Sequence, residues 1–77
     1  MLWIKAQPDR KSPGERWTCS VPPDGSHTLT VFAKGDGRWS WECHAAGAPR
    51  PMATGIVGSL AAAKTVSVNF LKRIGQI

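Results

Sequence analysis

The sequence predicts a small α+β domain in which an antiparallel sheet of three to four strands packs on one C-terminal α-helix. Two segments that alternate apolar and polar residues, 28–34 and 38–45, flank the glycine-rich turn 35–37, a pattern typical of a β-hairpin. Near the C-terminus the apolar residues recur every three or four positions, as on one face of a helix. A chain of 77 residues has room for one domain, and we expect 1–77 to form it.

The N-terminal part, 1–26, is expected to hold irregular chain or short strands. Apolar and polar residues alternate at 2–7 and again at 16–21, which predicts a short strand at each place. Pro22 and Pro23 end the second of these strands, because proline has no N–H to donate to a central ladder.

The segment 27–57 is expected to form a strand meander, and its hairpin has two possible registers. A two-residue turn would set Val31 opposite Glu42 and mix apolar and charged residues on one face. A three-residue turn, with Gly37 in a left-handed bulge position, separates the two kinds of residue, so we predict this register. One face then carries Ala33–Trp39, Val31–Trp41 and Leu29–Cys43, and the other carries Phe32–Ser40, Thr30–Glu42, Thr28–His44 and Lys34–Arg38.

The last element is predicted to be a helix over 59–74, preceded by a strand at 52–57 beside the second hairpin strand. Ser59 can cap the helix, since its hydroxyl accepts a hydrogen bond from a backbone N–H of the first turn. Lys72 and Arg73 complement the negative C-terminal end of the helix dipole. A single apolar stripe is predicted from Leu60, Ala63, Val66, Ser67, Phe70, Leu71 and Ile74.

The chain is basic, with ten Lys and Arg against five Asp and Glu, a formal net charge of +5. Asp9, Asp24 and Asp36 fall in turns rich in proline and glycine, so the sheet and helix are expected to be more basic than the average. This charge favours nucleic acid, with duplex DNA first, or an acidic protein surface as the partner. A soluble domain that is merely basic is the plain alternative.

Several function classes find no support in the sequence. No segment approaches the roughly 20 apolar residues of a membrane span, and the N-terminus lacks signal-peptide features, so we expect a cytoplasmic protein without membrane contact. Asp36 and Glu42 lie too far apart to act as an acid/base couple, and no glycine-rich phosphate loop is present. We therefore expect neither an enzyme nor a small-molecule substrate, and no cofactor.

The cysteines and histidines are potential metal ligands, and the two cysteines could also form a disulfide. Cys43 and His44 are neighbours on one predicted strand and point to opposite faces, so they cannot easily share a metal ion or act as a nucleophile pair. No metal site is expected. Cys19 could pair with Cys43 only if their strands are adjacent, and the favoured alternative is two separate buried thiols that act as small hydrophobes.

The polar face of the hairpin is the candidate functional surface. Its Lys34–Arg38 pair sets two like charges opposite each other, which costs stability unless water or an anion solvates them. Cations neutralise phosphates, while hydroxyls and an aromatic ring contact sugars or base edges. We assign to nucleic-acid binding Lys34, Arg38, Phe32, Ser40, Thr30, Glu42, His44 and Arg50. The alternative is a solvated face, or one covered by the N-terminal strand, whereas Trp39 and Trp41 are expected to pack on the helix.

Two segments resemble the ethylene-response-factor type of DNA-binding domain, which reads Gly-Lys-Trp-x-Ala-Glu-Ile-Arg, a loop, then Leu-Gly-Thr-Phe-x-Thr-x-Glu-Glu-Ala-Ala. Here they are Gly37-Arg38-Trp39-Ser40-Trp41-Glu42-Cys43-His44 and Ala53-Thr54-Gly55-Ile56-Val57-Gly58-Ser59-Leu60-Ala61-Ala62-Ala63-Lys64. Small arm-binding domains of phage and transposon integrases are similar in outline. The resemblance covers about half of the chain and implies three antiparallel strands on one helix, with the sheet laid in the major groove. It also implies DNA-facing positions for Arg38, Ser40, Glu42 and His44.

We therefore predict a small non-enzymatic nucleic-acid-binding or accessory protein of the kind that a phage or mobile element encodes, contacting DNA through the outer sheet face. The alternative is a protein–protein interaction module, such as a phage-encoded inhibitor of a host factor. Its anchors would be Trp3, Trp17 and Phe32, because tryptophan is enriched among interface hot spots.

Overall fold

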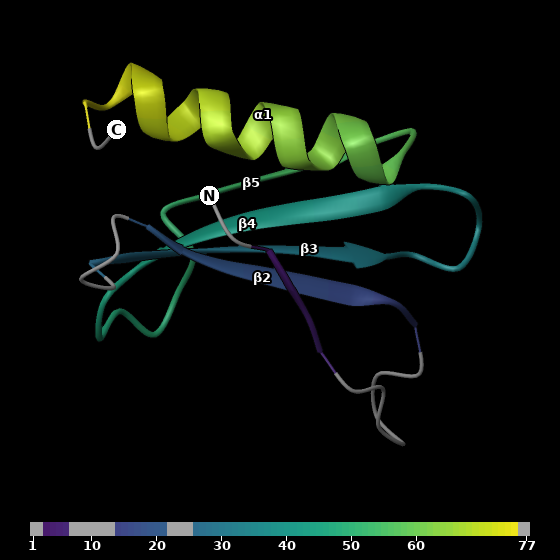
Figure 1. Ribbon diagram of the computed structural model, residues 1–77, viewed down its shortest axis with the longest axis horizontal. Helices are drawn as coiled ribbons and strands as arrows, with labels where there is room; N and C mark the ends of the chain where they lie inside the picture. The colour runs from purple at the N-terminus through teal and green to yellow at the C-terminus, as the bar shows by residue number, and fades with distance from the viewer. Residues whose placement is uncertain (1–2, 7–13, 22–25, 76–77) are drawn as a thin grey trace.

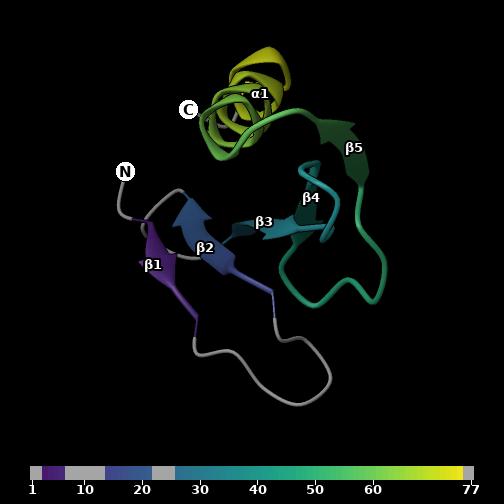
Figure 2. The same cartoon turned by 90° about the vertical axis from the view of Figure 1, so that its right-hand side faces the viewer.

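The structure, a computed structural model, describes residues 3–6, 14–21 and 26–75, and it is an antiparallel sheet with one helix on one face (Figures 1 and 2). The five strands follow the chain in the order β1-β2-β3-β4-β5. Their bounds are β1 Ile4–Lys5, β2 Arg16–Val21, β3 His27–Ala33, β4 Trp39–Ala45 and β5 Ala53–Val57, and the helix is α1 Leu60–Arg73. The predicted α+β class is confirmed, but the sheet has five strands where three to four were expected, because both N-terminal segments join it.

The β3–β4 hairpin has the predicted three-residue register. The backbone N–H of Lys34 donates to the carbonyl of Arg38 at 2.9 Å, which closes the turn. Gly35 and Gly37 have φ angles of 88° and 86°, in the region that side chains disfavour and glycine adopts readily. The cross-strand partners are those expected from the segregation of apolar and polar residues: Ala33 with Trp39, Val31 with Trp41, Leu29 with Cys43, Phe32 with Ser40, Thr30 with Glu42 and Thr28 with His44.

The N-terminal strands extend the sheet on the side of β3. Trp17 of β2 pairs with Val31, and Cys19 pairs with Leu29, so the apolar side of β2 continues the apolar side of the hairpin. β1 is only two residues long and pairs with the middle of β2. Of the predicted strand 2–7, residues 2 and 7 lie outside the described residues, and the other four include the two of β1.

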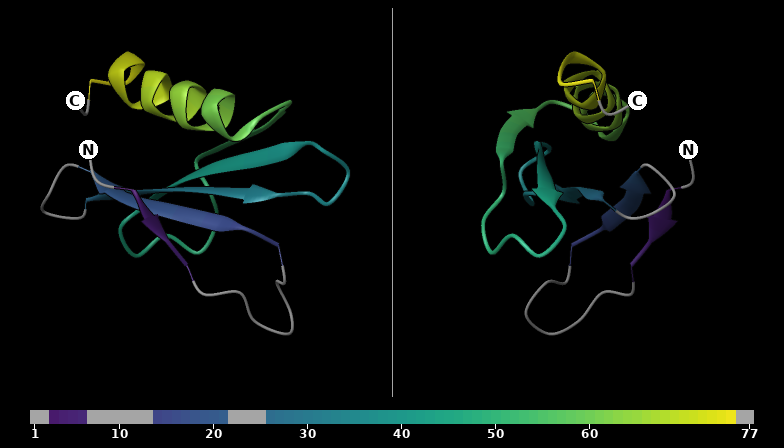
Figure 3. Two further views of the ribbon diagram at one scale, coloured as in Figure 1. Left: turned by 45° about the vertical axis from the view of Figure 1, so that its right-hand side comes forward. Right: turned by 90° about the vertical axis from the view of Figure 1, so that its left-hand side faces the viewer.

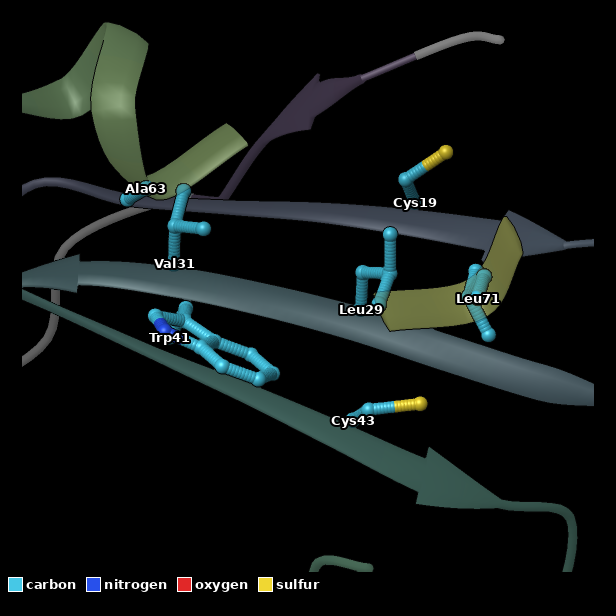
Figure 4. Close-up of a cluster of buried hydrophobic side chains, with 7 residues drawn as sticks. All are labelled: Cys19, Leu29, Val31, Trp41, Cys43, Ala63 and Leu71. Carbon is cyan, nitrogen blue, oxygen red and sulfur yellow. The ribbon is translucent and has the colours of Figure 1, made fainter. Parts of the chain in front are cut away.

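The core lies between α1 and the face of the sheet that carries the apolar hairpin pairs (Figure 4). We call this the inner face. Trp41 is 7% exposed, and Trp39 packs against the same cluster, so both side chains lie on the helix side as predicted. The buried apolar residues are Cys19, Leu29, Val31, Trp41, Cys43, Ala63 and Leu71.

The helix begins as the sequence predicts but buries a narrower stripe than expected. The hydroxyl of Ser59 accepts a hydrogen bond from the N–H of Ala62 at 3.1 Å, which satisfies one backbone donor of the first turn. Val66 and Ile74, both predicted to lie on the buried stripe, are exposed. The helix packs mainly on β3 and β4 and less on β5 (Figure 2), and Ile74 is the C-cap residue beyond the last residue of α1.

The two cysteines lie on β2 and β4, with β3 between them, so they are not cross-strand neighbours and form no disulfide. Both are buried on the inner face, and burial raises the pKa of the Cys43 thiol. His44 is on the opposite face, where it pairs with Thr28. Within the described residues no three potential metal ligands come together, and no helix there is long and apolar enough to cross a membrane.

Candidate nucleic-acid interface

The face of the sheet opposite α1, which we call the outer face, is not covered by any helix or strand of the described part of the chain (Figure 3). Its residues form three rows across the strands because side chains alternate between the two faces. The rows are Arg16–Phe32–Ser40–Ile56, then Ile4–Thr18–Thr30–Glu42–Thr54, then Ser20–Thr28–His44. The face is therefore rich in hydroxyl groups, with an aromatic ring and a cation in the row nearest the β3–β4 turn.

Two cations contact one aromatic ring at that end of the face. The guanidinium carbon of Arg16 lies 5.6 Å from the centroid of the Phe32 ring, and the ammonium of Lys34 lies 6.0 Å from it. Each such contact contributes about 0.5–1 kcal/mol at an exposed site. We call Arg16, Phe32 and Lys34 the cationic cluster, which places two positive charges around one ring near the turn.

Asp36, a residue of the same turn, binds Arg38. The Arg38 guanidinium donates to Oδ2 of Asp36 at 2.5 Å and 2.8 Å, and the Arg38 backbone N–H donates to Oδ1 at 3.1 Å. These hydrogen bonds hold the pKa of Asp36 below its ordinary value. The like charges of Lys34 and Arg38 are thus offset within the turn itself. The carboxylate that accepts from Arg38 belongs to Asp36 of the same turn, so part of the anionic contact expected for this pair comes from the chain itself.

The other residues assigned from the sequence differ in how accessible they are. Ser40 faces outward but is only 5% exposed, between its strand partners Phe32 and Ile56. Thr30, Glu42 and His44 are half-buried on the same face, and Arg50 is exposed in the loop between β4 and β5. The structure therefore brings together Phe32, Lys34 and Arg38 near the turn, places Glu42 at the centre of the face and leaves Arg50 in the loop.

Arg16 belongs to the cationic cluster but is absent from the site residues predicted from the sequence. The alternation of Arg16 with Trp17 and Cys19 indicates that it faces outward once those two face the core. Its position over Phe32 also depends on the pairing of Arg16 with Phe32 across β2 and β3. That register also depends on the connection between the two strands, which includes Pro22, Pro23, Asp24 and Gly25.

Trp3 and Trp17, two of the predicted anchors for a protein partner, both contact Lys64 of the helix. The ammonium of Lys64 lies 4.2 Å from the ring centroid of Trp17 and 5.5 Å from that of Trp3. The Trp17 indole N–H also donates to a carboxylate oxygen of Glu15 at 2.9 Å. Both rings are half-buried and pack against the core. Their contacts therefore join the N-terminal part of the chain to α1 within the protein.

Comparisons with protein-family models, with characterised proteins and with solved structures found no match for this chain.

Proposed function

We propose that this protein binds nucleic acid, duplex DNA in the first place, through phosphate contacts at the β3–β4 end of the outer face. The observation that carries the proposal is the cationic cluster, in which Arg16 and Lys34 both lie within about 6 Å of the centre of the Phe32 ring. Cations of this kind neutralise phosphates and supply most of the sequence-independent affinity for DNA. The formal net charge of +5 adds long-range attraction to a polyanion.

The width of the sheet favours backbone contact over a sheet laid flat in the major groove. Four spacings of about 4.8 Å between five strands give about 19 Å, which exceeds the groove width of about 12 Å. The β3–β4 turn extends beyond the ends of β2 and α1 in Figure 1, so this end of the sheet can approach a duplex first. We therefore propose a protein that contacts the DNA backbone with little preference for sequence.

The rest of the face supports this position for the backbone. Glu42 carries a negative charge at the centre of the outer face and repels phosphate. The charge of Glu42 favours a phosphate backbone near the turn over one lying across the middle of the sheet.

The test is the salt dependence of binding to a labelled duplex of mixed sequence, followed by fluorescence anisotropy. The logarithm of the binding constant should fall with the logarithm of salt concentration, with a slope of about −0.9 per neutralised phosphate. The double variant Arg16→Gln/Lys34→Gln should weaken binding on every sequence and make the slope shallower by about 1.8, which corresponds to two lost phosphate contacts.

The matched control is the double variant Lys72→Gln/Arg73→Gln, which removes two positive charges from exposed positions of α1. It should leave the slope close to that of the wild type. The proposal is rejected if no complex forms at low salt, or if Lys72→Gln/Arg73→Gln reduces the slope as much as Arg16→Gln/Lys34→Gln does.

A further inference from the structure

The two edges of the sheet differ in how well they are protected against pairing with another strand. β1 forms one edge with only two residues, of which Lys5 is charged. β5 forms the other edge with five residues, Ala53–Val57, and contains neither a charge nor a proline. Folded proteins usually protect an edge by shortening it or by placing lysine or proline on it. Only the β1 edge has such protection.

The hydrogen bonds at the two ends of the β3–β4 ladder show which residues of β4 bond to β3. Near the turn, Lys34 donates to the carbonyl of Arg38, and at the other end Ala46 donates to the carbonyl of Ser26, both at 2.9 Å. Hydrogen-bonded pairs recur at every second residue of an antiparallel ladder. The even-numbered residues of β4 therefore bond to β3, and the odd-numbered residues bond to β5.

The same alternation shows which backbone groups of β5 point to the open edge. The odd-numbered residues of β4 pair with Ala53, Gly55 and Val57, whose backbone groups are thus directed into the sheet. The N–H and carbonyl groups of Thr54 and Ile56 point the other way, toward the open edge. These two residues are placed symmetrically on either side of Gly55.

We propose that β5 pairs antiparallel with β5 of a second copy of this chain, about a two-fold axis at Gly55. Thr54 of each copy then lies opposite Ile56 of the other, and the exposed N–H and carbonyl groups form about four backbone hydrogen bonds. The axis is perpendicular to the sheet, so both helices lie on one side and both outer faces lie on the other. The assembly closes at two copies, because a two-fold interface uses the same patch of both partners.

The chemistry of the edge favours a second copy over a charged partner. The chain has a formal net charge of +5, yet two β5 strands can meet without placing like charges opposite each other, because the strand carries none. Ile56 is 54% exposed on the outer side of this strand and would pack beside Thr54 of the other copy. The contact between the two β5 strands, which we call the seam, is thus uncharged and partly apolar, which suits self-association.

Unfilled space also lies between α1 and Trp41, the cross-strand partner of Gly55. A cavity of about 190 Å³ lies between α1 and the sheet, lined by Trp41, Val66, Asn69, Phe70 and Arg73. Trp41 lies over Gly55, which has no side chain of its own to cover the edge. With the axis at Gly55, the Trp41 rings of the two copies come to lie on either side of it, over the seam.

The test is the mass of the full chain in solution, measured by sedimentation equilibrium over a range of concentrations. The wild type should show a species of twice the 8.3 kDa of one chain. Ile56→Pro removes an N–H that donates to no strand of its own chain, and proline is tolerated on such an edge. It should raise the dissociation constant of the dimer about thirtyfold, because one hydrogen bond is lost on each side of the axis.

A second variant and a control keep the result interpretable if proline disturbs the fold. Ile56→Lys places a charge at the seam and should also yield the monomer, with an unchanged circular dichroism spectrum. Ile4→Lys makes the same change on the β1 edge, where Ile4 is 59% exposed, and should leave the dimer intact. A wild-type chain that stays monomeric throughout, or Ile56 variants that remain dimeric, would overturn the proposal.

The dimer does not rest on the DNA-binding proposal. Ile56→Pro leaves the charge of the outer face unchanged, so DNA binding by this variant and dimerisation by the Arg16→Gln/Lys34→Gln variant are separate measurements with separate outcomes.

Discussion

The indole of Trp41 lies so close over Gly55 that a Cβ built on the glycine would be 2.5 Å from Nε1. The two residues are cross-strand partners on β4 and β5. On the helix side, the Trp41 ring meets Phe70 at a centroid distance of 5.9 Å and an angle of 45°. Gly55 therefore allows the largest side chain of the core to approach β5 closely, in a strand where glycine would otherwise weaken the ladder.

Gly55→Ala should destabilise the protein by about 1–3 kcal/mol, because the added methyl forces a packed indole to move. Urea unfolding followed by tryptophan fluorescence measures the change in the free energy of unfolding. Gly58→Ala is the control, since a Cβ there meets nothing within 4 Å. It should change stability by no more than about 0.5 kcal/mol. Equal losses for the two variants would mean that the contact with Trp41 is not the cause.

The pairing of Asp36 with Arg38 predicts a pH dependence of the turn. Hydrogen bonds from Arg38 lower the pKa of the Asp36 carboxyl below its ordinary value of 3.8. The folded state then binds this proton more weakly than the unfolded state, so the pairing stabilises the turn above pH 3.8 and this stabilisation is lost as the pH falls through the lowered pKa. An NMR titration of the Asp36 side-chain carbon should show a midpoint below 3.8. In the Arg38→Gln variant the midpoint should return toward that value, and an unchanged midpoint would show that Arg38 is not responsible.

The two cysteine thiols should be protected from reagents in the folded protein. Cys19 and Cys43 are both at most 2% exposed, and burial raises the pKa of Cys43, which lowers its thiolate fraction at neutral pH. Labelling with a thiol-reactive disulfide reagent should be slow under native conditions and rapid in denaturant, with two thiols counted per chain. A count of zero in denaturant without reductant would instead indicate a disulfide, which the intervening strand β3 opposes.

Lys64→Met should destabilise the protein by about 1 kcal/mol, because it keeps the aliphatic stem but removes the charge that contacts Trp3 and Trp17. The emission spectrum of the folded protein should shift as well, since the charge near two indoles is lost. Lys72→Met is the control, because Lys72 is exposed. If both variants unfold at the same denaturant concentration, the Lys64 contacts contribute nothing measurable.

The parts of the fold that depend on local pattern were predictable from the sequence. Only one register of the hairpin places Val31 and Trp41 on the face opposite Glu42, and the structure has that register. Ser59 indicated the start of the helix for a similarly local reason, because a cap requires only its own hydroxyl and the first turn. Both predictions concern residues that are close together in the chain.

The parts that depend on packing between distant segments were not predictable. The alternation of residues within β2 does not specify that Arg16 pairs with Phe32, and so the cationic cluster was not predicted. Nor does the periodicity of the helix show that α1 lies over β3 and β4 and leaves Val66 exposed beside β5. Each of these features is determined by how elements meet in space, which a pattern within one element does not encode.

The most direct test of the proposed interface is a map of backbone amide NMR shifts while duplex DNA is added to the folded protein. The account predicts that the largest changes fall on Arg16, Phe32 and Lys34, at one end of the outer face, and that α1 around Lys72 changes little. Changes centred on α1, with the cationic cluster unaffected, would contradict it.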